Sequence, residues 1–384
     1  MTISKKTNTM PLLNMRHFSL STEAKLPTIK AFFASLLIAS LVLASYPALA
    51  QSSHNDRFES ELWYLDQISA NGVRSGYVHS QVIVAVLDAG FDLDHEDLVG
   101  QYWVNADETS GYQKDDDGNG YEDDVTGWDF VDNDPDPTPD LSEPIRDIVV
   151  SHGTVIAGII AAIEGNDLGI RGVAPHAKIM PLRVLNRDGG GSTTDVRRAV
   201  RYAVENGADI INLSITFTSP DERLQETLEW AHEQGVVIVG AIGNSNLDTD
   251  VTPMYPACYD NEIGRNVVIG VAASDRTDKK ASFSDFGSDC VDLVAPGVDI
   301  FATAYHDPSI LLLSTAYASP WEGTSLAAPI VAGAAALLRG QYPSITPDQV
   351  RNVLKLSVDP VAETSLEARK RLGAGRLNIA KALE

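Results

Sequence analysis

Basic side chains are scarce in this sequence of 384 residues. It has 29 lysine and arginine residues against 53 aspartate and glutamate residues, which gives a formal net charge of −24 at pH 7. An excess of negative charge this large argues against nucleic acid and anionic membranes as partners. It suits a soluble protein in which some of the acidic side chains bind cations.

Long apolar runs are also scarce, and the run near the N-terminus is short for a bilayer span. Residues 31–45 read AFFASLLIASLVLAS, follow Lys25 and Lys30, and lead to an Ala-x-Ala sequence ending at Ala50. A basic flank, a short apolar core and a small-residue end are typical of a secretory signal peptide. We therefore predict a signal peptide over residues 1–50 and a secreted or periplasmic protein without membrane contact after cleavage. A membrane anchor is the alternative, although no basic cluster follows the run.

Cysteine is rare. Cys258 and Cys290 are the two in the chain, and both lie in the part predicted to be exported. An oxidising compartment would allow them to form a disulfide. Two separate buried thiols are the alternative, and the sequence leaves both open.

Internal repeats and signs of a second domain are lacking. The composition, 44% apolar and 21% charged, is that of an ordinary globular protein. We predict a short polar N-terminal segment at residues 51–59 after the signal peptide, and a single domain over residues 60–384.

From about Ser80 onward, apolar strand-like runs alternate with stretches of helical periodicity. The predicted strands are Val82–Leu87, Ile179–Val184, Asp209–Ile215, Val236–Ala241 and Val267–Val271. The predicted helices are Thr193–Asn206, Asp221–Gln234, and two buried ones that begin near His152 and near Ser325. This alternation predicts an α/β fold, with a mostly parallel central sheet flanked by helices on both faces. Functional residues of such sheets gather at the carboxyl ends of the strands.

Three short segments contain residues suited to nucleophilic catalysis. They are Asp88-Ala89-Gly90 after a predicted strand, His152-Gly153-Thr154 at a predicted helix start, and Gly323-Thr324-Ser325 at the head of a helix of small residues. A serine hydroxyl is a weak nucleophile until a base accepts its proton, and a carboxylate must hold that base in the correct tautomer. Taken singly, such an aspartate is usually a cap and such a histidine a satisfied polar group. Together, in the order Asp, His, Ser, they favour a catalytic triad.

From about residue 60 to its end, the sequence resembles the subtilisin-like serine proteases. The matching segments are VIVAVLDAGFDLDHEDL (82–98), SHGTVIAGIIAA (151–162), GVAPHAKIMPLRVL (172–185), INLS (211–214), IGNS (242–245), ASFSDFG…VAPG (281–297) and GTSLAAPIVAGAAALL (323–338). The resemblance implies a subtilisin-like fold, with residues 60–384 as the catalytic domain of an endopeptidase that acts on protein or peptide substrates. We expect a monomer.

The same resemblance implies roles for individual residues. Asp88, His152 and Ser325 would form the triad. The side chain of Asn244 would be one donor of the oxyanion hole, and the backbone N–H of Ser325 at a helix N-terminus would be the other.

Substrate recognition in the family adds an extended peptide as a strand beside edge segments. The matching positions here are Gly189, Gly190, Gly191, Ser214, Ile215, Thr216, Ala241 and Gly243. Thr216 stands where a glycine is usual, and Ile242 stands where an alanine is common. This extra bulk would narrow or reshape the pocket for the residue before the cut, so the family's pattern does not predict which residue is preferred there.

An acidic segment, DDDGNGYEDD at residues 115–124, has the alternate oxygen-bearing positions of an EF-hand-like loop. The predicted calcium ligands are Asp115, Asp117, Asn119, the carbonyl of Tyr121, and Asp124. The glutamate expected at position 12 of such a loop is absent because Thr126 stands there, so Asp124 would close the shell earlier. A solvated acidic turn is the alternative.

The resemblance implies a second calcium site around Asp97 and the loop at 163–170. Its ligands would be the side chains of Asp97 and Asn166 and the carbonyls of Ile163, Leu168 and Ile170. Calcium is the one cofactor that the sequence implies.

Other functions are compatible with parts of this sequence pattern. A catalytically silent binding protein would usually have lost a triad member or the oxyanion donor, and all four are present. A processing protease of narrow specificity would share the same chemistry. A lipase-type Gly-x-Ser-x-Gly turn is absent because Ala327 replaces the second glycine. The family match begins at about Glu61, so we expect no pro-domain of the usual length and either unaided folding or a separate folding partner.

Overall fold

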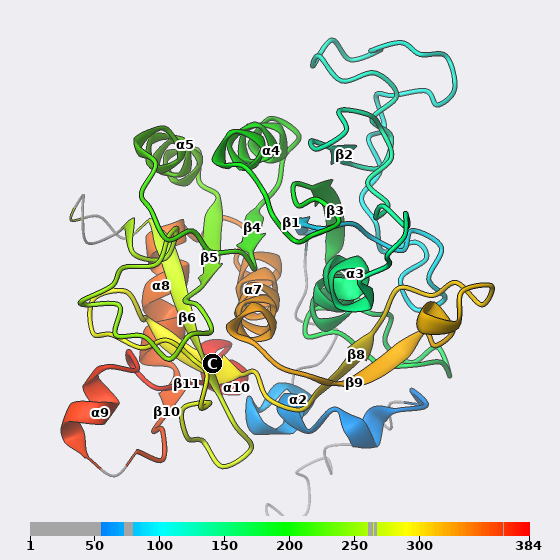
Figure 1. The fold of residues 1–384 in the computed structure, drawn as a ribbon. Helices are drawn as coiled ribbons and strands as arrows, with labels where there is room; N and C mark the ends of the chain where they lie inside the picture. Colours follow the sequence, from blue (N-terminus) through cyan, green and yellow to red (C-terminus); the bar gives the residue numbers. More distant parts are fainter. Residues whose placement is uncertain (1–54, 73–79, 260–263, 265–266, 364) are drawn as a thin grey trace, which may run out of the picture. The chain divides into compact units, whose positions relative to one another are not determined.

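The structure, a computed structural model, describes residues 55–72, 80–259, 264, 267–363 and 365–384 (Figure 1). These residues belong to one compact unit. The predicted signal peptide lies outside the described residues. Within them, no helix combines the length and the apolar character that a membrane crossing needs.

A nine-stranded sheet runs through the described part of the chain (Figure 1). Its order is β10-β11-β7-β6-β5-β4-β1-β3-β2, and all neighbours are parallel except β10 and β11. The strands are β1 (Ile83–Asp88), β2 (Trp128–Asp129), β3 (Lys178–Arg183), β4 (Ile210–Leu213), β5 (Val237–Ala241), β6 (Val268–Ser274), β7 (Leu293–Pro296), β10 (Val358–Asp359) and β11 (Arg376–Leu377). Because β3 lies on one side of β1 and β4 on the other, the connections diverge here and open a crevice at the carboxyl ends.

Helices cover both faces of the sheet. In Figure 1, α4 and α5 lie on the upper side, and α3 and α7 on the lower side. The helices are α2 (Trp63–Gln67), α3 (Asp147–Ala161), α4 (Thr193–Glu205), α5 (Glu222–Glu233), α7 (Thr324–Gln341), α8 (Pro347–Leu356), α9 (Leu366–Lys370) and α10 (Ile379–Ala382), with 3-10 turns η1 (Glu59–Glu61), η2 (Ala70–Gly72) and η4 (Leu311–Leu313).

Each face of the sheet has its own hydrophobic core because strand side chains alternate in direction. Val84 and Val86 of β1 join the core beneath α3 and α7. Ala85 and Leu87 join the core beneath α4 and α5. The fold class predicted from the sequence is confirmed.

The predicted elements agree with the observed ones to within a few residues at each end. The five predicted strands are β1, β3, β4, β5 and β6, and the four predicted helices are α3, α4, α5 and α7. The helix predicted to begin near His152 was misplaced at its start, because α3 begins at Asp147. Packing stabilises the helical conformation of this first turn. Val150 is buried, and Val149 lies against the loop at Gly189.

An antiparallel hairpin of β8 (Ile300–Thr303) and β9 (Tyr317–Trp321) lies apart from the main sheet. The described N-terminal residues pack against it and against the C-terminal residues. The indole Nε1 of Trp63 donates to the carbonyl of Asp299 at 3.1 Å, and the N–H of Ile379 donates to the carbonyl of Ile68 at 2.8 Å. Residues near the described N-terminus are therefore hydrogen-bonded to segments that lie more than 200 residues later in the chain.

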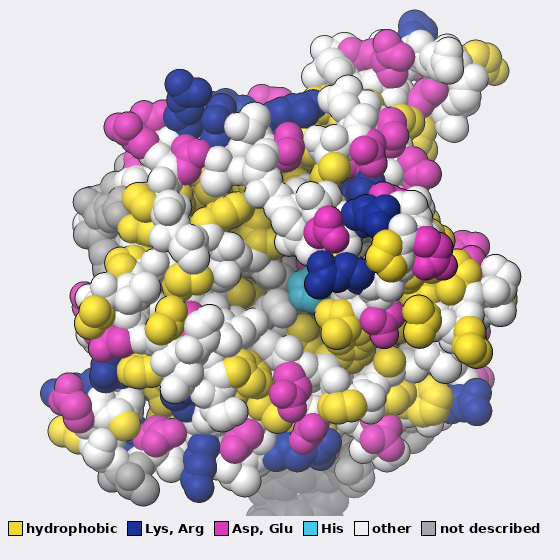
Figure 2. Space-filling model, in the orientation of Figure 1, with side chains coloured by type: hydrophobic (Ala, Val, Ile, Leu, Met, Phe, Trp, Pro, Cys, Tyr) yellow, Lys and Arg dark blue, Asp and Glu magenta, His cyan; other side chains and the backbone are white. Residues whose placement is uncertain are grey.

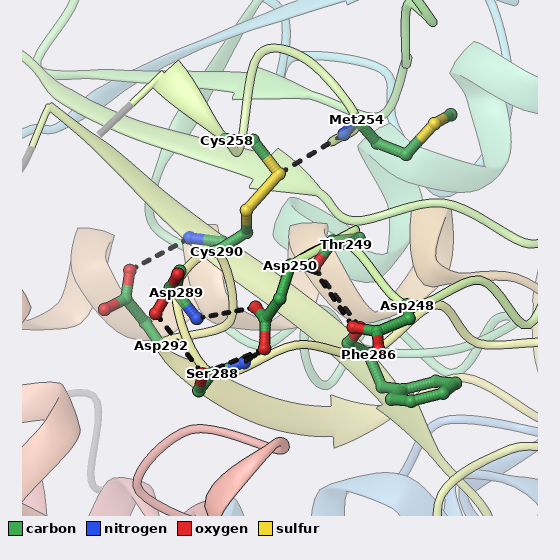
Figure 3. Close-up of a disulfide and its surroundings, with 11 residues drawn as sticks. Asp248, Thr249, Asp250, Met254, Cys258, Phe286, Ser288, Asp289, Cys290 and Asp292 are labelled. Atoms are coloured by element: carbon green, nitrogen blue, oxygen red, sulfur yellow. Dashed lines mark hydrogen bonds between the residues drawn. A yellow bond between two sulfur atoms is a disulfide. The ribbon is translucent and has the colours of Figure 1, made fainter. Parts of the chain in front are cut away.

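Cys258 and Cys290 are joined by a disulfide, which is one of the two alternatives that the sequence left open (Figure 3). It links the loop that follows β5 to the loop that precedes β7, with 4.8 Å between the Cα atoms. Asp250 reinforces this link, because its carboxylate accepts the N–H groups of Ser288 and Asp289 at 3.0 and 3.1 Å (Figure 3).

Candidate active site

Asp88 and His152 meet at the carboxyl end of the central strand. Asp88 is the last residue of β1, is fully buried, and accepts the N–H of Ala89 at 2.7 Å. His152 lies in the second turn of α3, and its Nδ1 is 2.8 Å from Asp88 Oδ1 and 2.9 Å from Oδ2. A side chain at Gly153 would collide with the carbonyl of Gly90, so glycine lets α3 come close enough for this contact.

Asp88 also controls the proton affinity of the imidazole. Burial alone would lower the pKa of His152, because the charged ring loses hydration. The negative charge of Asp88 and its hydrogen bonds to Nδ1 oppose this effect and outweigh it, so the pKa of His152 is raised above its ordinary value. When Nδ1–H is donated to Asp88, Nε2 remains as the basic atom of the neutral ring.

Ser325 lies in the first turn of α7, directly after Thr324. Gly323 precedes them with a φ of +154°, a conformation that favours glycine. The Oγ of Ser325 and the Nδ2 of Asn244 lie 2.8 and 3.4 Å from the place that a Gly323 Cβ would occupy. Both atoms therefore border one small space at a helix N-terminus, where free N–H groups and the helix dipole favour negative charge.

The amide of Asn244 is oriented by Thr324, a residue to which the sequence analysis assigned no role. Asn244 Oδ1 accepts from the backbone N–H of Thr324 at 2.8 Å and from its hydroxyl at 2.9 Å. The amide nitrogen is thereby left to donate toward the space beside Ser325. Thr324 is fully buried, and its Oγ1 also accepts the N–H of Gly243 at 3.1 Å.

A buried carboxylate that the sequence analysis missed holds the loop after Asn244. Oδ1 of Asp285 accepts the N–H groups of Ser245 and Leu247 at 2.9 and 2.7 Å, and the Asp285 N–H donates to the carbonyl of Gly243 at 2.9 Å. Asp285 is fully buried. The one available signal was its position in the segment ASFSDFG.

Ser214 is hydrogen-bonded to the first turn of α7. Its hydroxyl donates to the carbonyl of Ser325 at 2.7 Å and accepts from the side-chain amide of Asn212 at 3.0 Å. Ser214 therefore has a structural contact in addition to its predicted place along the substrate.

A cavity of about 490 Å³ opens at Ser325. Figure 2 shows a histidine side chain exposed near the middle of this face. The cavity is lined by Ala89, Ile148, Val149, His152, Leu185, Gly189, Gly190, Gly191, Ser214, Ile215, Thr216, Phe217, Asn244 and Ser325.

Most of the predicted substrate positions line this cavity. Ala241 and Gly243 do not: Ala241 is buried at the end of β5, and the backbone of Gly243 contacts Thr324 and Asp285. Five lining residues were not among the predicted site residues: Ala89, Ile148, Val149, Leu185 and Phe217. Ile148 and Val149 belong to the early first turn of α3. They would have been found only with the correct start of that helix.

The acidic loop gathers part of its predicted ligand set. Asp117 and Asp124 both accept from the side-chain amide of Asn119, at 3.0 and 2.9 Å. Asp115 instead turns to its own loop, where its carboxylate accepts the N–H groups of Gly118, Asn119 and Gly120 at 2.6 to 3.1 Å. The ring of Tyr121 packs against Tyr202, with 5.0 Å between centroids. Glu108, which the sequence analysis missed, lies beside Asp117 and Asp124.

The second predicted calcium site is held together by hydrogen bonds to Asp97. Its carboxylate accepts from the side-chain amide of Asn166 and from the N–H of Ile170, both at 2.8 Å. Its carbonyl accepts the N–H of Ile163 at 3.1 Å, whereas the carbonyl of Leu168 accepts the N–H of Arg57 at 2.6 Å. Asp97 is fully buried, and burial is the main reason that its pKa is raised to about 6.

A mostly parallel sheet with a cleft that His152 and Ser325 line is the arrangement of a serine peptidase built on an α/β fold. A model of the subtilase family matches residues 79–375. The chain belongs to the subtilase family, and it is a subtilisin-like serine endopeptidase.

Individual relatives agree with this family. Thermitase of Thermoactinomyces vulgaris is 36% identical over 301 residues, which cover 78% of this chain and 88% of thermitase. Subtilisin DY of Bacillus licheniformis is 33% identical over 321 residues, covering 83% of this chain and 96% of that protein. The solved structure of a protease from Pseudoalteromonas arctica PAMC 21717 has a TM-score of 0.68 and 27% identity, covering 86% of this chain and 99% of that chain.

Proposed function

We propose that the chain hydrolyses peptide bonds through an acyl-enzyme formed on Ser325, with His152 as general base and Asp88 as the residue that orients it. The two short hydrogen bonds between His152 Nδ1 and Asp88, in the cleft that Ser325 lines, are the observation that carries this proposal. Within the described residues, the hydroxyl of Ser325 makes no hydrogen bond. Contacts of this kind often tighten only once substrate is bound.

In the first half of the reaction, Ser325 Oγ attacks the carbonyl carbon of the substrate while Nε2 of His152 takes the hydroxyl proton. The negative charge on the substrate oxygen would receive hydrogen bonds from Asn244 Nδ2 and the N–H of Ser325. The intermediate then collapses, the C–N bond breaks, and the imidazolium gives its proton to the leaving amine.

In the second half, a water molecule gives a proton to Nε2 of His152 and attacks the ester. The ester bond to Ser325 breaks, the carboxylic acid leaves, and the serine regains its proton. Asp88 remains ionised throughout and stabilises the imidazolium in both halves.

The substrate would be an extended segment of a protein or peptide. Gly189–Gly191 and Ser214–Thr216 both line the cavity and would offer backbone groups to such a strand. The described residues that line the cavity include no lysine, arginine, aspartate or glutamate. Uncharged substrate side chains beside the scissile bond suit this lining.

Export, a monomeric state and stabilisation by calcium complete the proposal. The predicted signal peptide supports export. The acidic loop supports calcium binding, because carboxylate and amide oxygens are the ligands that this ion prefers. The ion would hold surface loops in place and would not take part in the chemistry.

The decisive test is casein hydrolysis by the protein without residues 1–50, beside its Ser325→Ala variant. We expect activity in the parent and a loss of about 10⁶-fold in the variant, the size measured for subtilisin, a member of the same family. A folded parent that neither cleaves casein nor reacts at Ser325 with a fluorophosphonate probe would support the silent-scaffold alternative. Labelling without casein cleavage would indicate a processing protease of narrow specificity.

A further inference from the structure

Three carboxylates from two separate segments meet beside the acidic loop. One oxygen each from Glu108, Asp117 and Asp124 lie within 4.8 Å of one another. Asp124 is fully buried and Glu108 is 9% exposed, whereas Asp117 is open to solvent. The cluster is thus largely enclosed, with one side through which an ion can enter.

One oxygen in this cluster lacks a partner. Oε1 of Glu108 accepts the N–H groups of Asp116 and Asp117 at 2.7 and 3.1 Å. Its Oε2 is buried and makes no hydrogen bond within the described residues. A buried carboxylate oxygen without a partner is costly, and negative neighbours increase the cost. A cation bound among the three carboxylates would remove this energetic cost.

The remaining contacts of the cluster hold the carboxylates in place without neutralising them. Asp124 accepts from the side-chain amide of Asn105 at 3.1 Å and from the hydroxyl of Tyr202 at 2.7 Å. Asp117 accepts from the amide of Asn105 at 3.0 Å. Every hydrogen-bond donor here is neutral. Among the described residues, the exposed ammonium of Lys114 is a cation that interacts with Glu108, and it is paired with Asp116.

We propose that Glu108, Asp117 and Asp124 form the core of a calcium site, and that Asp115 is not one of its ligands. The proposal rests on the calcium-binding part of the proposed function and changes its ligand set. Three carboxylates held by a loop suit Ca²⁺, which accepts six to eight oxygens in flexible geometry. They suit Mg²⁺ less, because it demands a tight octahedron. Asp115 is left out because it is not one of the clustered carboxylates and its own carboxylate accepts three N–H groups of its loop.

Terbium luminescence reports directly on this site. Tyr202 lies 5.0 Å from Tyr121 and 6.4 Å from Trp103, measured between ring centroids, and its hydroxyl contacts Asp124. Excitation of these rings would therefore sensitise a Tb³⁺ ion bound there. The titration is performed on the full mature chain carrying Ser325→Ala to prevent self-digestion, and the bound Tb³⁺ is then displaced with Ca²⁺.

Glu108→Gln and Asp115→Asn are the matched variants, since each removes one carboxylate charge from the same region. We expect Glu108→Gln to weaken Tb³⁺ and Ca²⁺ affinity by about tenfold or more, and Asp115→Asn to change it by less than about threefold. Equal affinity in Glu108→Gln and the parent, or the larger loss in Asp115→Asn, would overturn the proposed ligand set.

The Tm measured in excess chelator shows whether Glu108 acts as a calcium ligand or only stabilises the fold. Glutamine keeps an oxygen for the two N–H groups and removes the unpaired charge. Glu108→Gln should therefore melt no lower than the parent without calcium, and should lose the rise in Tm that calcium gives the parent. A lower Tm in chelator would assign Glu108 a structural role and overturn the proposal. If the parent itself binds neither ion, calcium binding fails while Ser325-dependent casein hydrolysis remains a separate result.

Discussion

At the scale of single residues, the proposed mechanism makes the charge of Asp88 determine the pH at which His152 would act as a base. Only the neutral imidazole accepts the serine proton, so kcat/KM falls as the pH falls through the pKa of His152. Asp88 raises that pKa. Asp88→Asn should therefore move the acidic limb of the pH–rate profile to lower pH and reduce kcat by about 10⁴-fold, the size measured for subtilisin without its aspartate.

The measurement is the pH dependence of peptide hydrolysis for the parent, Asp88→Asn and the exposed control Glu226→Gln. The control should match the parent. An acidic limb that stays in place in Asp88→Asn would contradict the assigned role of the carboxylate.

Asp92, four residues after Asp88, is a second buried carboxyl group, and we expect it to affect stability. Its Oδ2 accepts the N–H of His306 at 2.9 Å. Burial, followed by a hydrogen bond with Asp94, raises the pKa of Asp92 to about 7. Because the folded state binds this proton more tightly than the unfolded state, its contribution is complete below about pH 4 and is lost as the pH rises through about 7.

Asp92→Asn should remove this dependence. Between about pH 4 and about pH 7, the free energy of unfolding of the variant should improve relative to that of the parent. Urea unfolding at several pH values, with both proteins carrying Ser325→Ala, measures the difference. A constant difference across this range would show that Asp92 does not titrate as described.

Residues that lie within short motifs could be predicted, and residues that act across the chain could not. Asp88, His152 and Asn244 each lie in a short segment whose pattern alone was enough to predict that residue as part of the site. Asp285 contacts a loop about forty residues earlier in the chain, and Glu108 meets carboxylates from a separate loop. A lone acidic residue carries no pattern that pairs it with such partners.

At the scale of secondary-structure elements, the disulfide fixes the loop that follows Asn244 to the loop before β7. Cys258 and Cys290 are 32 residues apart, and closing a loop of that length stabilises the folded state by about 4 kcal/mol in the chain-entropy model. Cys258→Ala with Cys290→Ala should lower the free energy of unfolding by about that amount.

Urea unfolding in the Ser325→Ala background measures this loss, and the reduced parent is the control that should behave like the double variant. Equal stability of the oxidised parent and the double variant would contradict the prediction. Mass spectrometry of non-reduced peptides verifies the bond itself.

The strands that could be predicted from the sequence are those with long, uniform apolar runs, such as β1 and β5. The hairpin of β8 and β9 was missed because β9 is only partly buried and shows no clear alternation. The early start of α3 was missed because Arg146 provides no side-chain cap to mark it. Packing of Val149 and Val150 determines this end of the helix, and local propensity does not reveal it.

At the scale of the whole molecule, a formal net charge of −24 makes bound divalent cations stabilising. Calcium at about 100 times its dissociation constant should raise the free energy of unfolding by about 2.7 kcal/mol for one site. Thermal melts of the Ser325→Ala protein in calcium, magnesium and excess chelator measure this effect. Equal Tm values in calcium and chelator would contradict it.

The central position of α7 also shapes how the chain folds. This helix packs on α3 and on β1, β4, β5, β6 and β7, all of which precede it in the chain. Until α7 is made, the apolar face of β4, β5, β6 and β7 lacks the helix that packs on it, and contacts of such long sequence separation form slowly. The helix that covers the core also carries Ser325. The proposed nucleophile and the completion of this core therefore depend on the same late helix, so we expect no peptidase activity from a chain in which α7 has not formed.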